Sequence, residues 1–410
     1  MKLLRLCAYF TPEKTASSHF YDDAYKAYSK AKIDCVCITP EPSRGISDEV
    51  RREYKNKRID TLYDGYVTVK RFPMIKEGRN PIQRALRYFL CSIQTYRYAI
   101  KEKDIDVIFV GSTPPTMGAV ASRVAKKLSK KYGRKVPLVY NLQDIFPDSL
   151  VTAGLAKKGG LLWKIGRKLE NYTYRNSDKI IVISEGFKRN IVEKGVEESK
   201  IEIVSNWINM DETVPITRQD NTIFDEFSLD RKKFWVVYAG NFGEVQGANI
   251  VLDAAQILSD DDDIFFAVFG AGSKFFAAKE KAKEMNNIFI HDLLPIDRVS
   301  EVYSMGDVSL ITCKKGAGKS ALPSKTWSIM ACNTPIIAAF DNDSDLANII
   351  SNAGAGKCVE PENPEALAEA ILEAKNKKID SKSDKLRSYV EKTASKDICL
   401  SKYLEIFTNV

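Results

Sequence analysis

The stretch FWVVYAGNFGEVQG, residues 234–247, decides the fold. Its first part, FWVVYAG, is apolar and rich in aromatic and β-branched residues, which predicts a buried strand, and a glycine-containing loop follows at once. The polar stretch NMDETVPITRQDNT (209–222) precedes it and indicates a linker. Because a pattern of strands and helices runs up to this linker and then starts again, the sequence predicts two units of the same kind.

Short apolar runs alternate with segments of helical period in both halves, as in α/β domains with parallel sheets. The first half has predicted strands at 3–10, 33–39, 66–72, 106–111, 137–142, 179–184 and 201–205, and helices at 81–102, 117–131, 161–176 and 186–194. The second half has predicted strands at 234–240, 264–270, 287–293, 307–313, 335–340 and 356–360, and helices at 248–258, 274–285, 297–304, from about 323, and 363–376.

These patterns predict two Rossmann-like domains, at 1–208 and 209–384. Ligands of such sheets bind beyond the carboxyl ends of the strands, so we expect the domains to face each other across a cleft that holds the active site. The last segment, about 385–410, has helical spacing, and we expect it to pack back on the first domain.

The composition, with 44% hydrophobic and 28% charged residues, is typical of soluble globular chains. No apolar run approaches the ~18 residues of a membrane span. Pro12 also interrupts the N-terminal apolar segment before the core of a signal peptide forms. We therefore expect a cytoplasmic protein whose eight scattered cysteines are reduced core residues.

The sequence gives little sign of a metal site. It has no CxxC pair and no H-E-x-x-H, and its two histidines are His19 and His291. Three aspartate groups, DID (104–106), DDDD (260–263) and DNDSD (341–345), have a spacing that a metal-diphosphate site uses. They flank predicted strands in polar turns, so we interpret them as solvated turn residues and expect no catalytic metal.

The charge is distributed unevenly along the chain. Residues 1–200 hold 39 basic and 22 acidic side chains, a net +17, while the remainder holds 23 and 32, a net −9. This asymmetry indicates that the first half faces an anionic partner, and both nucleic acid and a membrane leaflet qualify. The basic side chains expected to contribute lie in 51–58, 70–101 and 157–175. The alternative is a solvated basic face that keeps the protein soluble.

Three loops of the second half follow predicted strands, where a phosphate would be met: YAGNFGEVQG (238–247), FGAGSK (269–274) and GAGKSALPSK (316–325). A single glycine loop is usually only a turn, but three in one sheet favour a diphosphate site. Lys325 stands at a predicted helix start behind Pro323, where free N–H groups and the dipole favour an anion. Lys319 and Lys325 add charge suited to a diphosphate.

The GAGKS sequence at 316–320 invites comparison with the phosphate loop of an ATPase. A full P-loop needs a further glycine, five residues before the second glycine, and that position is Cys313. The stretch also lies in the last quarter of the chain. We therefore disfavour a P-loop NTPase.

In the order of these loops the chain resembles glycosyltransferase family 4, of the GT-B fold. It is similar in particular to the bacterial subgroup that adds sugars to lipid-linked precursors of O-antigen or capsule, such as L-fucosamine transferases. The resemblance covers nearly the whole chain, through STPPTMGAVAS (112–122), NLQDIFPDSLVTAGL (141–155), the stretch 169–209 with its SNW, YAGNFGEVQG, FGAGSK, MGDVSLITC (305–313) and ALPSKTWSIMACNTPIIA (321–338). QDIFPDS, SNW and LPSK are the most specific of these.

The chain departs from the family pattern at charged positions. Two glutamates that contact the donor sugar and ribose are replaced by Ser320 and Ser328, and the Arg and Lys of the first donor loop by Asn241 and Gln246. A histidine at the end of the fourth strand is also missing, with Gly111 and Ser112 nearby. The positive charge for the diphosphate must then come from elsewhere, with Lys325 the first choice and Lys274 the second.

The resemblance implies retaining, metal-independent transfer of a sugar, without a cofactor, from a UDP-linked nucleotide-sugar to a lipid-diphosphate-linked saccharide. It further implies that the protein works peripherally on the inner face of the cell membrane. The residues assigned to catalysis are Lys325 and Asp144. Those assigned to the donor are Gly240, Asn241, Gly243, Gln246, Gly270, Gly272, Lys274, Leu293, Ser320, Ala321, Leu322, Pro323, Ser324 and Ser328. Those assigned to the acceptor are Ser18, His19, Pro114 and Asp144.

Three alternatives remain beside this interpretation. One is a GT-B sugar-nucleotide epimerase, and another is the P-loop NTPase. The third is a nucleic-acid-binding protein, although the basic half lacks a patch in which aromatic and basic residues alternate. For Asp144, capping of the following turn is an equally good structural role.

Overall fold

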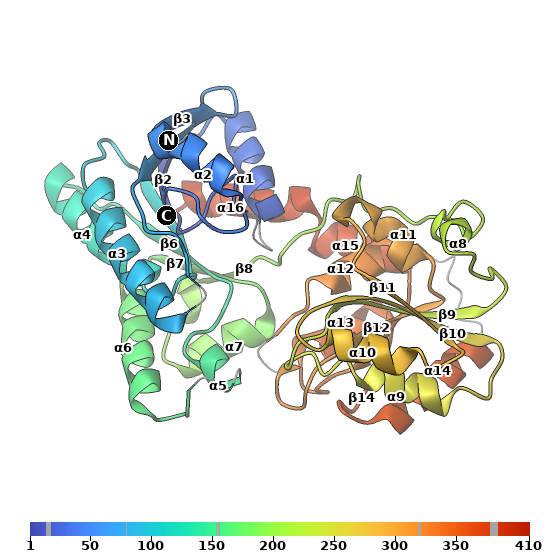
Figure 1. Ribbon diagram of the computed structural model, residues 1–410. Coiled ribbons are helices and arrows are strands. Elements are labelled where there is room, and N and C mark those ends of the chain that lie inside the picture. The colour runs from blue at the N-terminus through green and yellow to red at the C-terminus, as the bar shows by residue number, and fades with distance from the viewer. Residues whose placement is uncertain (14–17, 79, 153, 155, 319–320, 378–383) are drawn as a thin grey trace. The chain divides into compact units, whose positions relative to one another are not determined.

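The computed structural model describes residues 1–13, 18–78, 80–152, 154, 156–318, 321–377 and 384–410. These residues form two compact units: unit 1 holds Met1–Ser205 and Leu400–Val410, and unit 2 holds Asn206–Cys399. Each unit is a mainly parallel sheet covered by helices (Figure 1). The prediction of two Rossmann-like units is confirmed.

Unit 1 contains an eight-stranded sheet in the order β3-β4-β2-β1-β5-β6-β7-β8. Its strands are β1 (Lys2–Leu6), β2 (Asp34–Pro40), β3 (Ile59–Leu62), β4 (Val67–Phe72), β5 (Val107–Gly111), β6 (Leu138–Leu142), β7 (Lys179–Val182) and β8 (Ile201–Ile203). All neighbours are parallel except β3 and β4. The edge strand β3 escaped prediction because its side chains alternate between exposed and half-buried, which leaves no apolar run.

Helices cover both faces of this sheet (Figure 1). One face carries α3 (Pro81–Ala99), α4 (Met117–Tyr132) and α6 (Leu161–Asn176), and the other carries α1 (Ser18–Lys30) and α16 (Lys396–Thr408). The remaining helices of unit 1 are α2 (Asp48–Asn56), α5 (Asp148–Thr152), α7 (Glu185–Glu193) and η1 (Glu198–Lys200). Within the described parts of the chain, no helix is long and apolar enough to span a bilayer.

The C-terminal segment forms two helices where one was expected. Phe407 of α16 packs on Tyr28 and Phe109, with ring centroids 5.9 and 5.1 Å apart, so α16 packs on unit 1 as predicted. The preceding helix α15 (Lys385–Thr393) instead buries Leu386 in the core of unit 2. The chain breaks between the helices because Ile208 exchanges backbone hydrogen bonds of 2.9 and 3.0 Å with the residues at 394 and 396.

Unit 2 contains a six-stranded, fully parallel sheet in the order β11-β10-β9-β12-β13-β14. Its strands are β9 (Phe234–Asn241), β10 (Ile264–Ala271), β11 (Ile288–Asp292), β12 (Val308–Thr312), β13 (Ile336–Ala339) and β14 (Gly356–Val359). Its other helices are α8 (Ile223–Glu226), α9 (Ile250–Ile257), α10 (Phe275–Ala282), η2 (Ile296–Arg298), α11 (Val299–Ser304), α12 (Lys325–Ala331), α13 (Asp345–Ala353) and α14 (Pro364–Lys377).

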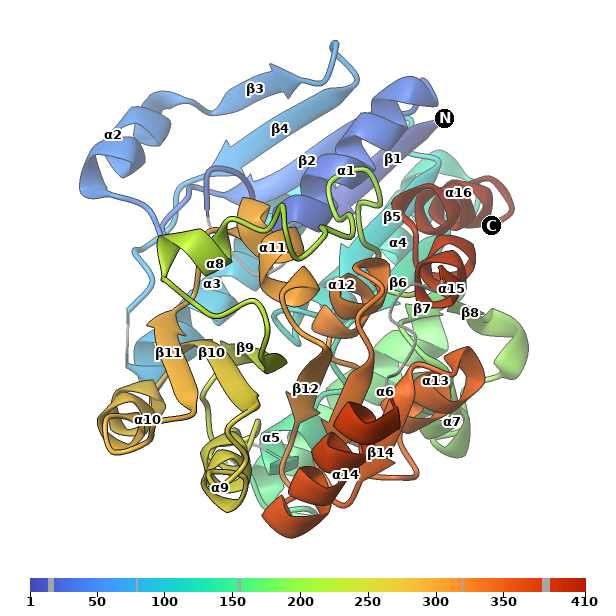
Figure 2. The same cartoon turned by 90° about the vertical axis from the view of Figure 1, so that its right-hand side faces the viewer.

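The central strand β9 is buried on both faces, as its continuous apolar run predicts. Trp235 and Val237 enter one core layer together with α11, α12, α13 and α15. Val236 and Tyr238 enter the opposite layer, with α9, α10 and α14. Figure 2 shows α11 and α12 on one side of the sheet and α9, α10 and α14 on the other. The two layers fix β9 rigidly, so that its carboxyl end can position polar groups.

Candidate functional site

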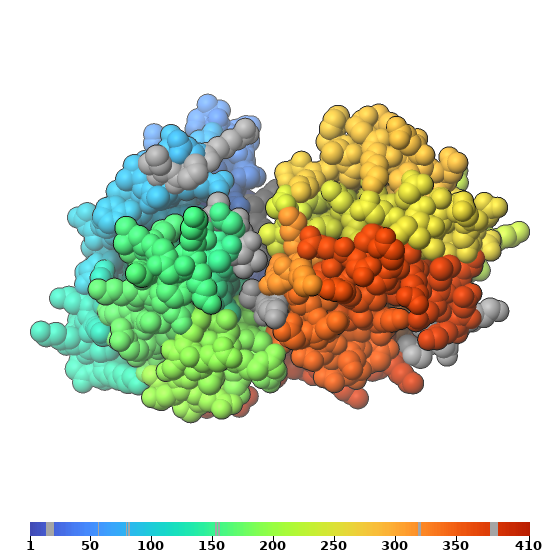
Figure 3. All heavy atoms as spheres, turned by 90° about the horizontal axis from the view of Figure 1, so that it is seen from below, coloured from blue at the N-terminus to red at the C-terminus, as the bar shows by residue number. Residues whose placement is uncertain are grey.

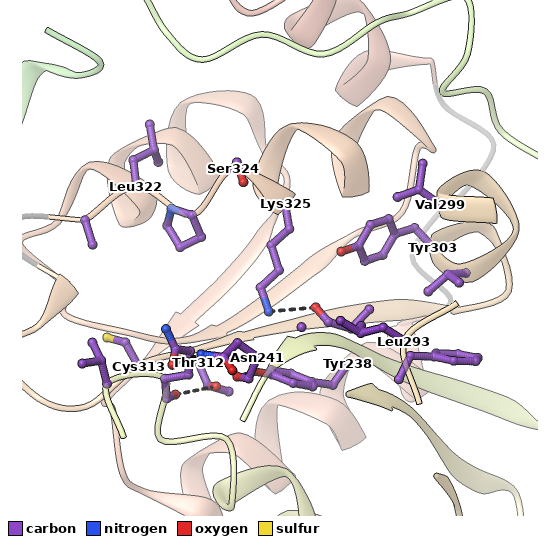
Figure 4. A pocket seen from close by; sticks show the side chains of 18 of the residues that line it. Tyr238, Asn241, Leu293, Val299, Tyr303, Thr312, Cys313, Leu322, Ser324 and Lys325 are labelled. Atoms are coloured by element: carbon purple, nitrogen blue, oxygen red, sulfur yellow. Dashed lines mark hydrogen bonds between the residues drawn. The ribbon is translucent and has the colours of Figure 1, made fainter. Parts of the chain in front are cut away.

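A pocket of about 490 Å³ lies in unit 2 at the carboxyl ends of β9 and β12. The strand order runs from β9 through β10 to β11 in one direction, and from β12 through β13 to β14 in the other. The connections after β9 and β12 therefore leave in opposite directions, which opens the crevice where ligands of doubly wound sheets bind. Side chains from β9, β12, α11 and α12 converge on this space (Figure 4).

Lys325 is the sole charged side chain among the described residues that line the pocket. It stands at the first position of α12, and its side chain extends to the end of β9, where Nζ donates to the carbonyl of Ala239 at 3.2 Å (Figure 4). The ammonium also lies 4.1 Å from the centre of the Tyr238 ring. Burial lowers the pKa of Lys325 to about 7. An anion in the pocket would counteract this effect and favour the charged form.

Neutral polar groups lie next to Lys325 at the end of β9. Asn241 donates from its side-chain amide to Oε1 of Gln246 at 3.1 Å, and Thr312 donates to the Gln246 carbonyl at 2.8 Å. The Tyr238 hydroxyl donates to the carbonyl of Asn241 at 3.0 Å. Asn241 and Gln246 thus stand together where the family pattern has two cations, and they offer hydrogen bonds without charge.

Two apolar walls enclose this polar centre (Figure 4). Leu322 and Pro323 form one wall, and Leu293, Val299 and their neighbours form the other. The arrangement suits a ligand that has an anionic centre and a flat apolar part.

The structure brings together most of the residues predicted for the donor. Those that line the pocket are Gly240, Asn241, Gln246, Leu293, Ala321, Leu322, Pro323 and Ser324, and the predicted catalytic residue Lys325 lines it as well. Those that do not line it are Gly243, Gly270, Gly272, Lys274 and Ser328. Ser320 and Lys319 lie outside the described residues.

The glycines outside the lining still shape the pocket. A Cβ on Gly272, whose φ is +121°, would stand 2.2 Å from Oδ1 of Asn241. A Cβ on Gly270 would stand 2.3 Å from the Phe275 ring. Both positions need glycine so that the loop after β10 can pack closely against Asn241 and α10.

Lys274, the second choice for a donor cation, faces away from the pocket. Its ammonium lies 2.5 Å from Oε2 of Glu244, and Lys314 pairs with the other oxygen of the same carboxylate. The two ammonium groups lower the pKa of Glu244 to about 2. Lys274 therefore joins the loops after β9, β10 and β12 on the surface, and it is already paired with a carboxylate.

The carboxylate of Asp341, which lies just after β13, enters the loop that resembles a phosphate loop. The backbone N–H groups of Gly316 and Gly318 each donate to one oxygen of this carboxylate, both at 2.8 Å. Asp341 is buried, so the interpretation of this residue as a solvated turn aspartate is wrong. These two amides hold a carboxylate of the chain itself, which argues against a P-loop and leaves the pocket beside Lys325 as the candidate anion site.

The residues predicted for the acceptor lie in unit 1. Ser18 and His19 begin α1, Pro114 is buried after β5, and Asp144 is exposed in the loop after β6. Nearby protein atoms shield the Asp144 carboxyl group from water, and this desolvation raises its pKa. A hydrogen bond with Ser149 opposes the shift. That contact fits the structural role considered for Asp144.

Among the unpredicted residues that line the pocket, three carry hydroxyl groups: Tyr238, Tyr303 and Thr312. Tyr238 and Thr312 are at or near the ends of predicted strands, and this position was a signal that could have found them. Tyr303 is a buried residue of α11 that approaches the pocket from a distant part of the chain, and no local pattern marks it.

Comparison with known proteins gives two family matches that follow one another along the chain. Residues 20–212 match the model described as Glycosyltransferase Family 4, and residues 219–396 match Glycosyl transferases group 1. The probable glycosyltransferase WbjE of Pseudomonas aeruginosa is 25% identical over 335 residues, 81% of this chain and 82% of its own. The putative colanic acid biosynthesis glycosyl transferase WcaI of Escherichia coli is 28% identical over 301 residues, 72% of each chain.

A solved structure has the same fold over the whole length. Anabaena Alr3699/HepE, solved in complex with UDP, superposes with a TM-score of 0.71 at 14% identity and covers 100% of both chains.

Proposed function

Because the chain belongs to glycosyltransferase family 4 and has the GT-B fold, we propose that it transfers a sugar from a UDP-linked donor to a saccharide carried on a lipid diphosphate. The observation that carries the proposal is the placement of Lys325 as the sole charged side chain among the described lining residues of the switch-point pocket. A nucleoside diphosphate combines an anion that would pair with this lysine and a flat base that the apolar walls would cover. The UDP complex of the structural relative HepE supports the choice of UDP.

The proposed reaction retains the configuration at the sugar carbon C1. The bond between C1 and the diphosphate oxygen breaks through an oxocarbenium-like state, and the acceptor oxygen bonds to C1 on the same face. The leaving phosphate oxygen takes the proton of the acceptor hydroxyl, so atoms and charge balance. Lys325 stabilises the negative charge that grows on the diphosphate, which is the largest catalytic contribution a fixed cation can make.

We propose that this chemistry needs no metal and no cofactor, since Lys325 supplies the positive charge. Within the described residues, no group of three or more His, Cys, Asp or Glu side chains is placed to hold a metal ion. A bound diphosphate also raises the pKa of Lys325 from about 7, because an opposite charge nearby favours the ammonium. The bound donor would thereby favour the charged form of the lysine that binds it.

The acceptor side of the proposal is a lipid-linked precursor of a surface polysaccharide, O-antigen or capsule. The name of the relative WcaI, which refers to colanic acid biosynthesis, supports this pathway class. The net charge of +17 on residues 1–200 supports an anionic membrane surface as the place of reaction. Asp144, exposed at the carboxyl end of β6, is the proposed side chain for acceptor contact.

Calorimetry is expected to show that UDP binds to the protein in EDTA, and that ATP binds at least tenfold more weakly. The apolar walls and Lys325 supply the contacts, so chelation should not change the affinity. Lys283→Ala, which removes an exposed lysine paired with Glu280, is the matched control and should bind UDP like the wild type. A strict requirement for magnesium, or a preference for ATP, would refute the proposal.

A further inference from the structure

Tyr238 of β9 touches two different parts of the candidate donor site. Its ring lies beside the Lys325 ammonium, with Nζ 4.1 Å from the ring centroid. Its hydroxyl group donates to the carbonyl of Asn241 at 3.0 Å. One side chain thus contacts both the cation and the loop that would surround a diphosphate in this pocket.

The Tyr238 ring is held in place by the core of unit 2. Tyr238 is 0% exposed, and Phe242 packs edge-on against it with ring centroids 5.2 Å apart. Both side chains belong to the core layer that contains α9, α10 and α14. In the space-filling view, atoms coloured yellow to red-orange, the colours of these helices, lie at the surface of unit 2 (Figure 3). This layer separates the ring from solvent and fixes its position below the ammonium.

The Lys325 ammonium group has three N–H donors. One donates to the carbonyl of Ala239 at 3.2 Å, and the Tyr238 ring covers a second side of the group (Figure 4). A donor remains for a ligand. Gly240 keeps the approach open, because a Cβ at this residue would stand 3.3 Å from Nζ of Lys325 and 3.7 Å from the Tyr238 hydroxyl oxygen.

The ring also affects the charge of the lysine. The face of an aromatic ring attracts a cation through its quadrupole, so it favours the ammonium over the neutral amine. Burial acts in the opposite direction and lowers the pKa of Lys325 to about 7. No carboxylate lines the pocket within the described part of the chain. The Tyr238 ring and the Ala239 carbonyl are therefore the groups that oppose the loss of the proton.

The other titratable groups that line the pocket stay neutral near pH 7. They are Tyr238 of β9, Tyr303 of α11 and Cys313, which follows β12. Burial raises the pKa of Tyr238 and of Cys313 to about 12, and it raises the pKa of Tyr303 above its usual range. Asp341, which follows β13, does not line the pocket. A change of charge in the pocket between about pH 6 and pH 9 therefore reports Lys325.

We infer that Tyr238 is a positioning residue of the donor site: its ring keeps Lys325 charged and in place for the diphosphate, and its hydroxyl group holds the backbone of Asn241. The inference deepens the proposed function and rests on it for the identity of the ligand. The competing explanation is that Tyr238 only fills the core below the loop. The charge distribution of its ring would then have no effect on Lys325.

The test compares phenylalanine with pentafluorophenylalanine at position 238, because the two rings have nearly the same shape and fluorination removes the negative potential of the ring face. NMR of protein with isotope-labelled lysine, recorded without UDP, follows the titration of Lys325, whose signal is identified by its loss in Lys325→Arg. The midpoint in Tyr238→Phe should stay close to that of the wild type. With pentafluorophenylalanine it should fall by about one pH unit.

Calorimetry with UDP then relates this charge to the ligand. At about pH 8 the pentafluorophenylalanine protein should bind UDP about tenfold more weakly than Tyr238→Phe, and at about pH 6 the two should agree within about threefold. Tyr238→Phe itself should bind about fivefold more weakly than the wild type at every pH, because Asn241 loses a hydrogen bond.

The matched control makes the same two replacements at Tyr389. This residue of α15 packs against the core of unit 2 and does not line the pocket. Both control proteins should titrate Lys325 and bind UDP like the wild type, within about twofold.

The inference is overturned if fluorination at position 238 leaves the midpoint of Lys325 unchanged, or if it weakens UDP binding equally at both pH values, because the ring would then act by packing alone. Wild-type affinity in Tyr238→Phe would remove the role of the hydroxyl group. Absent UDP binding in the wild type removes the proposed function. The NMR midpoint still decides in that case whether the ring keeps Lys325 charged.

Discussion

Replacing Lys325 with alanine is expected to lower kcat by about 10²-fold or more, the cost of removing one transition-state stabiliser. No other described side chain that lines the pocket carries a charge, so nothing there would take over the neutralisation of the leaving diphosphate. The measurement is steady-state transfer from a UDP-sugar at saturating donor. Lys283→Ala serves as the control for loss of an exposed lysine. A folded Lys325→Ala protein with unchanged kcat would remove this role from Lys325.

The pH dependence of UDP binding gives the same lysine a second readout. The free protein holds Lys325 with a pKa of about 7, and a bound diphosphate raises it, so binding above pH 7 takes up a proton. UDP affinity should therefore fall by up to about tenfold per pH unit above pH 7. The terminal phosphate of UDP ionises near pH 6, below this window. Lys325→Arg keeps a cation that does not titrate, so its affinity should be flat over the same range.

Replacing Asp341 with alanine is expected to lower the free energy of unfolding of unit 2 by about 2–4 kcal/mol, because the N–H groups of Gly316 and of the buried Gly318 lose a charged acceptor. The same loop leads to Leu322 and Lys325, so UDP affinity should fall as well. Three of the four tryptophans, Trp207, Trp235 and Trp327, lie in unit 2, so fluorescence during denaturant unfolding reports chiefly this unit.

The control for Asp341 is Asp262→Ala, which removes an exposed carboxylate from the same unit and should change stability by no more than about 0.5 kcal/mol. Equal free energies of unfolding for the Asp341 and Asp262 variants would show that the hydrogen bonds from Gly316 and Gly318 to Asp341 do not stabilise unit 2. A stable Asp341→Ala protein with normal UDP binding would separate the loop from the pocket.

The fold was predictable wherever a buried strand leaves a continuous apolar run. Two apolar runs, FWVVYAG and DVSLITC, correctly predicted β9 and β12. They thereby predicted the place where the strand order reverses. The edge strand β3 was missed because its residues alternate between exposed and half-buried positions, so its sequence contains no continuous apolar run. The break between α15 and α16 was missed because it depends on pairing with Ile208, which is about 190 residues away in sequence and is invisible to local pattern reasoning.

The site was predictable in its position but not in all its contacts. Lys325 could be singled out because a lysine at a helix start after a strand faces the ligand side of a parallel sheet. The engagement of Lys274 by Glu244 and the insertion of Asp341 into the glycine loop could not, because each joins loops that follow different strands. Both contacts follow from burial and charge balance in the folded unit, which sequence spacing does not encode.

We propose that the protein moves a sugar from a UDP-linked donor to a lipid-linked acceptor with retention. The most direct test incubates the protein, in EDTA, with a panel of sugar nucleotides and lipid-diphosphate sugars, and then determines the products by mass spectrometry and the new linkage by NMR. The proposed reaction yields an acceptor extended by one sugar, with one UDP released per linkage and the anomeric configuration of the donor retained. An inverted linkage, or an epimerised sugar nucleotide with no extended acceptor, would contradict it.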